Sequence, residues 1–337
     1  MTMAFDAKPT GGDNTQSNVD WDAMNKEIVD ICGTQKKKRS LVGVVSGVID
    51  LGEQPQPDSE VKFDGTPEQE AAEIAKNSNT YFKTAEKYFD NGKWLENVRL
   101  KCWPNKPRQS VAITVDFPQI MIDKGKYFGN SNPAPLRMLL NGEFTVNGER
   151  GLGRLFPITW EKLENGAWTI KRNTTLYKLA VAAGVVDDGE AMTGNDIPKL
   201  VGKAAQFEIQ VKLNESTGRY FMNEKIKFAG VIPEGLPIPE LDEKFQYSFE
   251  FDKENDEEVV RQMRASIKNT IKRANNYQGN AVQAQIEASE APRTSVEASS
   301  GESNANPKGE AKKPVKNAPT KPQQEVDFDD DEDTIPF

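Results

Sequence analysis

Apolar and polar residues alternate over several short stretches of the chain, and this is the period of a β-strand with one buried face. The clearest alternation predicts that two strands bury Val111, Ile113, Val115 and Phe117, and Phe207, Ile209, Val211 and Leu213. A third strand is predicted over residues 41–52, which are rich in Val and Ile. Gly43 and Gly47 within it indicate bends in a curved sheet.

Two β-hairpins are predicted from turn residues. Asp90-Asn91-Gly92 separates residues 81–89 from residues 94–103, and Asn-Gly is a favoured tight turn between strands. The polar turn at 214–218 leads to a return strand over 219–228. The residues expected to be buried on the two return strands are Trp94, Val98, Leu100 and Cys102, and Tyr220, Met222, Ile226 and Phe228.

Helical periodicity is confined to a few segments. Helices are predicted over 20–31, 67–77 and 174–183, with Asp20, Thr66 and Gly184 at their ends. The strongest apolar stripe predicts one long helix over 256–277, after an edge strand at 243–252.

These elements predict a mainly β (α+β) fold: an antiparallel, OB-fold-like barrel with inserted and C-terminal helices, plus a disordered acidic tail. The expected organisation is a loose N-terminal segment with a short helix (1–35), a barrel body (36–232), a Pro-rich link with an edge strand and a helix packed on the body (233–278), a disordered linker (279–324) and an acidic tip (325–337).

The charge of the chain is concentrated at its ends. The formal net charge of the 337 residues is -9, but residues 1–35 contribute -4, residues 281–337 contribute -6, and residues 36–280 contribute +1. A hydrophobic content of 36% is low for this length, which indicates that part of the chain does not fold. The near-neutral body can still carry a basic groove.

Residue types exclude several kinds of chemistry. The chain has no His and only two Cys, Cys32 and Cys102, so catalysis by His and a four-ligand Cys/His zinc site are excluded. No carboxylate cluster has the spacing of a metal-dependent nuclease. We therefore expect no enzymatic activity, no cofactor and no metal site. Two distant thiols, no signal-peptide pattern and no membrane-spanning apolar run predict a cytoplasmic protein.

Cations lie beside aromatic residues at several positions, as in proteins that bind single strands: cations meet phosphates, and bases stack on rings. The candidate nucleic-acid-binding residues are Lys36, Lys37, Lys38, Arg39, Arg99, Lys101, Trp103, Lys126, Tyr127, Arg154, Phe221, Lys225 and Lys227. Each has a simpler interpretation. The Lys36–Arg39 cluster can be a solvated surface, and a bulge in a strand would move Trp103 or Phe221 into the core.

The last thirteen residues read E-V-D-F-D-D-D-E-D-T-I-P-F, with seven acidic residues before an apolar end. This tip closely resembles the C-terminal tip of bacterial single-stranded-DNA-binding proteins, which is acidic and ends in Ile-Pro-Phe. The layout of the body resembles bacteriophage members of this class, for which the compartment would be the cytoplasm of the bacterial host. The resemblance implies a partner-binding role for Asp329, Asp330, Asp331, Glu332, Asp333, Ile335, Pro336 and Phe337.

The expected function is sequence-independent binding of single-stranded DNA, with the tip recruiting replication, recombination or repair proteins. A homo-oligomer and no membrane association are compatible with the sequence. One alternative is a strand-annealing or recombination-mediator protein. Another is a protein-interaction adaptor that does not bind DNA.

Overall fold

The structure is a computed structural model that describes residues 19–146, 149–216 and 219–290. Within these residues the chain forms two compact units, of residues 19–57 with 104–290, and of residues 58–103. Residues 1–18 of the predicted loose N-terminal segment, most of the predicted linker and the acidic tip lie outside the described residues.

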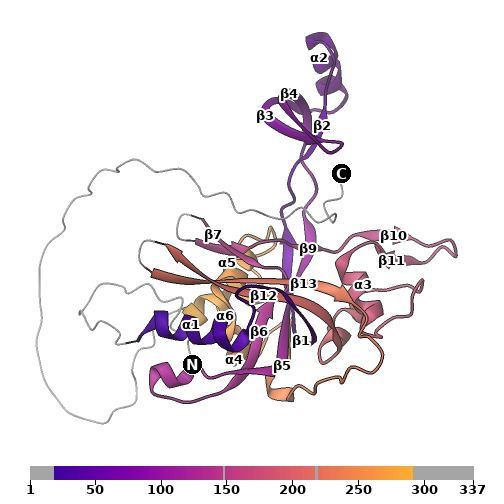
Figure 1. Cartoon of the computed structure of the whole chain (residues 1–337). Coiled ribbons are helices and arrows are strands. Elements are labelled where there is room, and N and C mark those ends of the chain that lie inside the picture. Colours follow the sequence, from indigo (N-terminus) through magenta and orange to yellow (C-terminus); the bar gives the residue numbers. More distant parts are fainter. Residues whose placement is uncertain (1–18, 147–148, 217–218, 291–337) are drawn as a thin grey trace, which may run out of the picture. The chain divides into compact units, whose positions relative to one another are not determined.

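The first unit is built on a seven-stranded sheet with the order β13-β12-β1-β5-β6, to which β14 and β9 add at β1 and β5 (Figure 1). The strands are β1 (Arg39–Gln54), β5 (Arg108–Ile122), β6 (Ala134–Leu139), β9 (Phe156–Pro157), β12 (Ala204–Ser216), β13 (Arg219–Gly230) and β14 (Tyr247–Phe249). All pairings are antiparallel except that of β1 with β14. The predicted mainly β, antiparallel class is confirmed.

The predicted closed barrel is wrong, because β6 and β13 end the hydrogen-bonded sheet and form no ladder with each other in the described residues. The two strands come into contact, and the Arg264 side chain bridges them. Its Nη2 donates to the Arg137 carbonyl of β6 at 2.9 Å, and its Nη1 lies 3.4 Å from the Glu224 carboxylate of β13. A hydrogen bond and an ion pair of one side chain thus connect β6 and β13, which a backbone ladder would join in a closed barrel.

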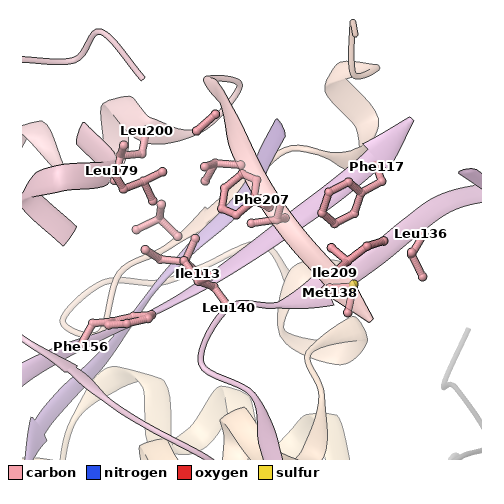
Figure 2. Close-up of a cluster of buried hydrophobic side chains, with 14 of the residues drawn as sticks. Ile113, Phe117, Leu136, Met138, Leu140, Phe156, Leu179, Leu200, Phe207 and Ile209 are labelled. Carbon is pink, nitrogen blue, oxygen red and sulfur yellow. The ribbon is translucent and has the colours of Figure 1, made fainter. Parts of the chain in front are cut away.

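One face of the sheet carries the larger apolar core, with α1 (Trp21–Cys32) and α3 (Thr175–Ala182) packed against it. The predicted inward positions of β5 and β12 are buried there, except that Leu213 is partly buried, and the rings of Phe117 and Phe207 meet edge to face at 6.2 Å (Figure 2). The helices predicted over 20–31 and 174–183 are confirmed, with the Asp20 and Thr174 side chains accepting hydrogen bonds at their N-termini.

A second apolar cluster joins Ile49, Leu51, Phe249 and Phe251 to three short helices: α4 (Glu257–Gln262), α5 (Ala265–Lys272) and α6 (Ala281–Glu290). The single helix predicted over 256–277 is wrong, since Met263 and Arg264 have extended ψ angles of 135° and 146°. The break allows Arg264 to bond with Glu143 and with the Arg137 carbonyl.

The predicted disorder of residues 279–290 is also wrong. Helix α6 forms there and buries Val282 and Ile286 against the second cluster. The edge strand predicted over 243–252 is shorter than expected. It consists of β14 after the 3-10 turn η4 (Glu243–Phe245), and the Tyr247 ring packs so closely over Gly47 that a Cβ there would clash.

Two small β-ribbons complete the first unit: β7 (Glu143–Val146) with β8 (Glu149–Leu152), and β10 (Trp160–Lys162) with β11 (Trp168–Ile170). Three 3-10 turns lie between the longer elements: η1 (Gly125–Phe128), η2 (Gly194–Asp196) and η3 (Pro198–Leu200). No helix in the described residues combines the length and apolar character that spanning a membrane requires.

The second unit is a three-stranded sheet with the order β2-β4-β3, made of β2 (Ser59–Lys62), β3 (Tyr81–Asp90) and β4 (Lys93–Trp103), with α2 (Pro67–Lys76) between β2 and β3 along the chain. The predicted Asn-Gly hairpin is confirmed: Asn91 and Gly92 have φ angles of 49° and 79°, as a tight type I′ turn requires. The helix predicted over 67–77 is confirmed as well.

The predicted burial of Trp94 is wrong, because its side chain is 66% exposed. Val98, Leu100 and Cys102 are buried as predicted. Asn97 has a φ of 52°, and beyond it Leu95, not Trp94, packs against this small core. The regular alternation of the strand is lost at that residue.

Candidate nucleic-acid interface

The β12–β13 hairpin presents one row of side chains on the sheet face opposite the larger core. Cross-strand pairs define it, from Glu208 opposite Lys227 to Asn214 opposite Phe221. We call it the hairpin face; its members are Glu208, Gln210, Lys212, Asn214, Phe221, Asn223, Lys225 and Lys227. The alternating residues Met222, Ile226 and Phe228 pack against the core as predicted, whereas Tyr220, also expected there, is 40% exposed. The predicted outward direction of Phe221, Lys225 and Lys227 is confirmed.

The middle of the hairpin face is hollowed. A pocket of about 160 Å³ is lined by three side-chain amides and two ammonium groups, those of Gln210, Asn214, Asn223, Lys212 and Lys225. Gln210 is only 8% exposed and is the most buried of the five. Amides both donate and accept hydrogen bonds, so the lining can meet base edges of several kinds as well as phosphate oxygens.

The charge of this pocket is uncompensated. Among the residues that the structure describes, no carboxylate forms an ion pair with Lys212 or Lys225. A polyanion can therefore bind both ammonium groups without displacing an existing partner.

Phe221 lies at the end of the pocket, opposite Asn214. Its side chain is 51% exposed, although an exposed Phe gains nothing from its contact with water. A ring held on a strand beside cations is the arrangement on which a base can stack.

The Lys36–Arg39 cluster is divided by the structure. Lys36 and Lys37 are exposed just before β1, and Lys38 pairs with Glu208 of the hairpin face at 2.9 Å. Arg39 turns away and donates from Nη1 to the Cys32 carbonyl at the end of α1, at 2.7 Å. Lys38 is thus joined to the hairpin face, whereas Arg39 stabilises a helix end.

In the second unit, Arg99 and Lys101 are both paired with carboxylates of α2. Arg99 binds Glu70 through two nitrogens at 2.7 Å, and Lys101 Nζ lies 2.5 Å from Glu73. Hydrogen bonds from Lys101 and Lys76 lower the pKa of Glu73 to about 2, and the Arg99 hydrogen bond lowers the pKa of Glu70. Trp103 is half-buried, and its ring centroid lies 5.7 Å from Lys101 Nζ. A phosphate would have to displace carboxylates here.

Lys126 and Tyr127 both contact Glu27 of α1, and their hydrogen bonds lower the pKa of that carboxyl. The same contact raises the pKa of Tyr127 to about 12. Arg154 donates from Nε and Nη2 to the Leu140 carbonyl at 3.3 and 3.2 Å, and its guanidinium lies 5.3 Å from the Phe156 ring centroid. These contacts hold loops of the first unit in place.

Gln210, Lys212 and Asn214 of β12 and Asn223 of β13 were not among the predicted site residues. The signal was available, because the alternation that places Phe207, Ile209 and Val211 inward also places the three β12 residues outward, and the alternation of Met222 and Ile226 does the same for Asn223. In the described part of the chain, no group of three or more His, Cys, Asp or Glu side chains is arranged to hold a metal ion. The predicted partner-binding residues, Asp329 to Phe337, lie outside the described residues.

Comparison of the chain with protein-family models, with curated proteins and with solved structures finds no match.

Proposed function

We propose that this chain binds single-stranded DNA without sequence preference, and that the hairpin face is where it does so. The observation that carries the proposal is the pocket of Lys212 and Lys225, which have no carboxylate partner in the described residues, on the same face as the exposed Phe221 ring.

Each part of this face suits one part of a single strand. The ammonium groups neutralise phosphates, which gives affinity that falls as salt rises. Phe221 stacks on a base, a contact that contributes about 1–3 kcal/mol and tolerates any base. The amides of Gln210, Asn214 and Asn223 adapt to donors and acceptors alike, so they add hydrogen bonds without imposing a sequence.

The acidic tip supports the second half of the proposal, recruitment of replication, recombination or repair proteins. Its seven carboxylates would be attracted to a basic surface, and the Phe337 ring could enter an apolar pocket on that surface. This part rests on sequence and on the resemblance of the tip to that of bacterial single-stranded-DNA-binding proteins.

A salt titration with the full chain tests the proposal. Fluorescence anisotropy would measure binding to labelled oligo(dT) and to a duplex of equal length. Lys212 and Lys225 of the pocket predict a slope of log K against log salt of about -1.4 for the single strand, at about -0.7 per phosphate contact. We expect weaker binding to the duplex, whose bases are not free to stack on Phe221.

The absence of oligo(dT) binding at low salt would overturn the proposal and favour the protein-interaction adaptor. Equal affinity for single strand and duplex would overturn the role of base stacking.

A further inference from the structure

The β10–β11 ribbon carries two exposed tryptophans. Trp160 is 47% exposed and Trp168 is 61% exposed. Trp160 pairs with Ile170, and Lys162 pairs with Trp168, so the register places both rings and Lys162 on the same face of the ribbon. In the described residues, neither indole ring contacts another aromatic ring.

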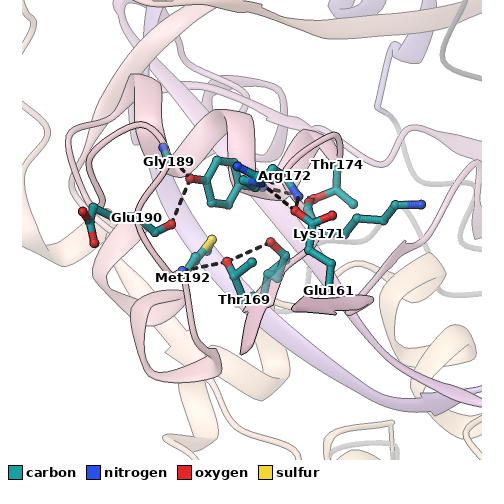
Figure 3. A network of polar contacts seen from close by, with 10 residues as sticks. Glu161, Thr169, Lys171, Arg172, Thr174, Gly189, Glu190 and Met192 are labelled. Atoms are coloured by element: carbon teal, nitrogen blue, oxygen red, sulfur yellow. Dashed lines mark hydrogen bonds and ion pairs between the residues drawn. The ribbon is translucent and has the colours of Figure 1, made fainter. Parts of the chain in front are cut away.

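The base of this ribbon is fixed by a polar network (Figure 3). The Ile170 backbone N–H donates to the Met192 carbonyl at 2.8 Å, and the Lys171 N–H donates to the Thr159 carbonyl at 2.7 Å. The Thr169 hydroxyl, buried below, accepts from the Met192 N–H at 2.9 Å. The two indoles therefore stand on a rigid support, and a ligand that stacks on them does not have to order the backbone first.

The charge beside the indoles is mainly positive. Glu161 is neutralised by Arg172, whose backbone N–H and Nε lie 3.0 and 2.8 Å from its Oε1 and lower its pKa. In the described residues Lys162, Lys171 and Glu164 form no close ion pair, although the charge of Lys171 acts on Glu161 and that of Glu164 acts on Arg172.

A ligand that suits this face of the β10–β11 ribbon has flat rings and negative charge. An apolar protein segment would cover the indoles but would also desolvate Lys162 without giving it a partner, which costs free energy. A single strand supplies bases for the rings and phosphates for the cations.

We propose that β10–β11 is a second stacking platform for single-stranded DNA, on which bases lie against Trp160 and Trp168 while Lys162 meets the backbone. This inference rests on the proposed function but uses none of the residues of the hairpin face.

Ultraviolet cross-linking tests both sites in one experiment. The full chain is irradiated with oligo(dT) of about 30 nucleotides, longer than the 4–16 nucleotides that one OB fold covers, and then digested with trypsin. Cleavage after Lys or Arg releases Trp160 in peptide 155–162, Trp168 in peptide 163–171 and Phe221 in peptide 220–225. We expect the nucleotide mass on all three peptides.

The outcomes separate the two proposals. Cross-links on peptide 220–225 without any on 155–171 overturn the second platform and leave the hairpin face in place. Cross-links confined to 155–171 overturn the assignment of binding to the hairpin face. The absence of any cross-linked peptide contradicts both.

Affinity measurements add a quantitative check. Replacing Trp160 and Trp168 by Ala should weaken binding to the same oligo(dT) by about tenfold for each base that loses its stack. Replacing both by Phe should retain most of the affinity, because a ring remains. The matched control removes Phe89 and Trp94, an exposed pair whose tilted rings contact each other with centroids 5.2 Å apart, and should leave the affinity unchanged. Equal affinity of the Trp160→Ala/Trp168→Ala variant and the original chain would overturn the platform.

Discussion

The β12–β13 and β3–β4 hairpins look alike in sequence and differ in structure. Both have a strand that alternates cations with buried apolar residues and also carries an aromatic. On β13 the face carries Lys225 and Phe221, and its pocket is free of carboxylates. On β4, Arg99 and Lys101 are both paired with acids. Strand alternation identifies a face, but another element decides the charge of that face.

The deciding element in the second unit is α2. Glu70 and Glu73 lie three positions apart and therefore share one side of the helix, whereas Arg99 and Lys101 lie two positions apart and share one side of the strand. Three helical residues rise about 4.5 Å and two strand residues about 6.8 Å, close enough for long side chains to pair one to one. The N-terminus of α2 is fixed by Gln69, whose Oε1 accepts from the Thr66 N–H at 2.9 Å.

Charge reversal in the pocket of the hairpin face should cause the largest loss of affinity for oligo(dT) among the variants of the two hairpins. In a Lys212→Glu/Lys225→Glu variant, two phosphate contacts are lost and two repulsions are introduced. Binding to oligo(dT) should weaken by about 50-fold or more in low salt, and the salt slope should decrease by about 1.4. Fluorescence anisotropy over a salt series measures both quantities.

The matched control neutralises the paired cations of the other hairpin, as Arg99→Gln/Lys101→Gln. Because these cations already have partners, its affinity should change by less than about twofold. A larger loss of affinity in this control than in the pocket variant would show that DNA binds to the β3–β4 hairpin and not to the hairpin face.

Phe221→Ala should produce the next largest effect. Loss of one stacked base weakens binding by about tenfold and leaves the salt slope unchanged, since no phosphate contact is removed. Trp103→Ala is the control, because the Trp103 ring is half-buried beside Lys101. An unchanged affinity of the Phe221→Ala variant would show that Phe221 does not stack on a base.

Removing the acids of α2 tests whether they cause the difference. A Glu70→Gln/Glu73→Gln variant leaves Arg99 and Lys101 with hydrogen-bonding partners but no neutralising charge. We expect oligo(dT) binding to tighten a few-fold and the salt slope to steepen by up to about 1.4, as two more cations become available to phosphates. Unchanged binding would mean that the β4 face is inaccessible to DNA for a reason other than its pairing.

Local patterns predicted most elements but not their long-range partners. Alternation found the buried faces of β5 and β12 and the outward direction of Phe221, and turn chemistry found the hairpin at Asn91. The single helix over 256–277 failed because Arg264 leaves the helical conformation to bond with Glu143, more than a hundred residues earlier. The pairing of Arg99 with Glu70 could not be predicted from the sequence either, because it depends on how the inserted helix α2 packs.

The smallest expected effect is the pH dependence of the contact between Glu73 and Lys101 in the second unit. The pKa of Glu73 in the folded chain is about 2, below the ordinary value of 4.5, because Lys101 and Lys76 donate to it. A carboxyl with a lowered folded pKa stabilises the fold fully above its unfolded pKa, and this contribution is lost as the pH falls from about 4.5 through about 2. Protection factors of the α2 amides, which remove the intrinsic pH dependence of hydrogen exchange, should therefore be highest at pH 5 and fall toward pH 2. The effect should be small, because the side chains of the pair are partly exposed and their interaction is screened. In a Glu73→Gln variant the protection factors should be lower at pH 5 and vary less with pH. A Glu73 carboxyl that titrates near 4.5 by NMR would show that Lys101 is not held by it, and Lys101 would then be as available to phosphate as Lys225.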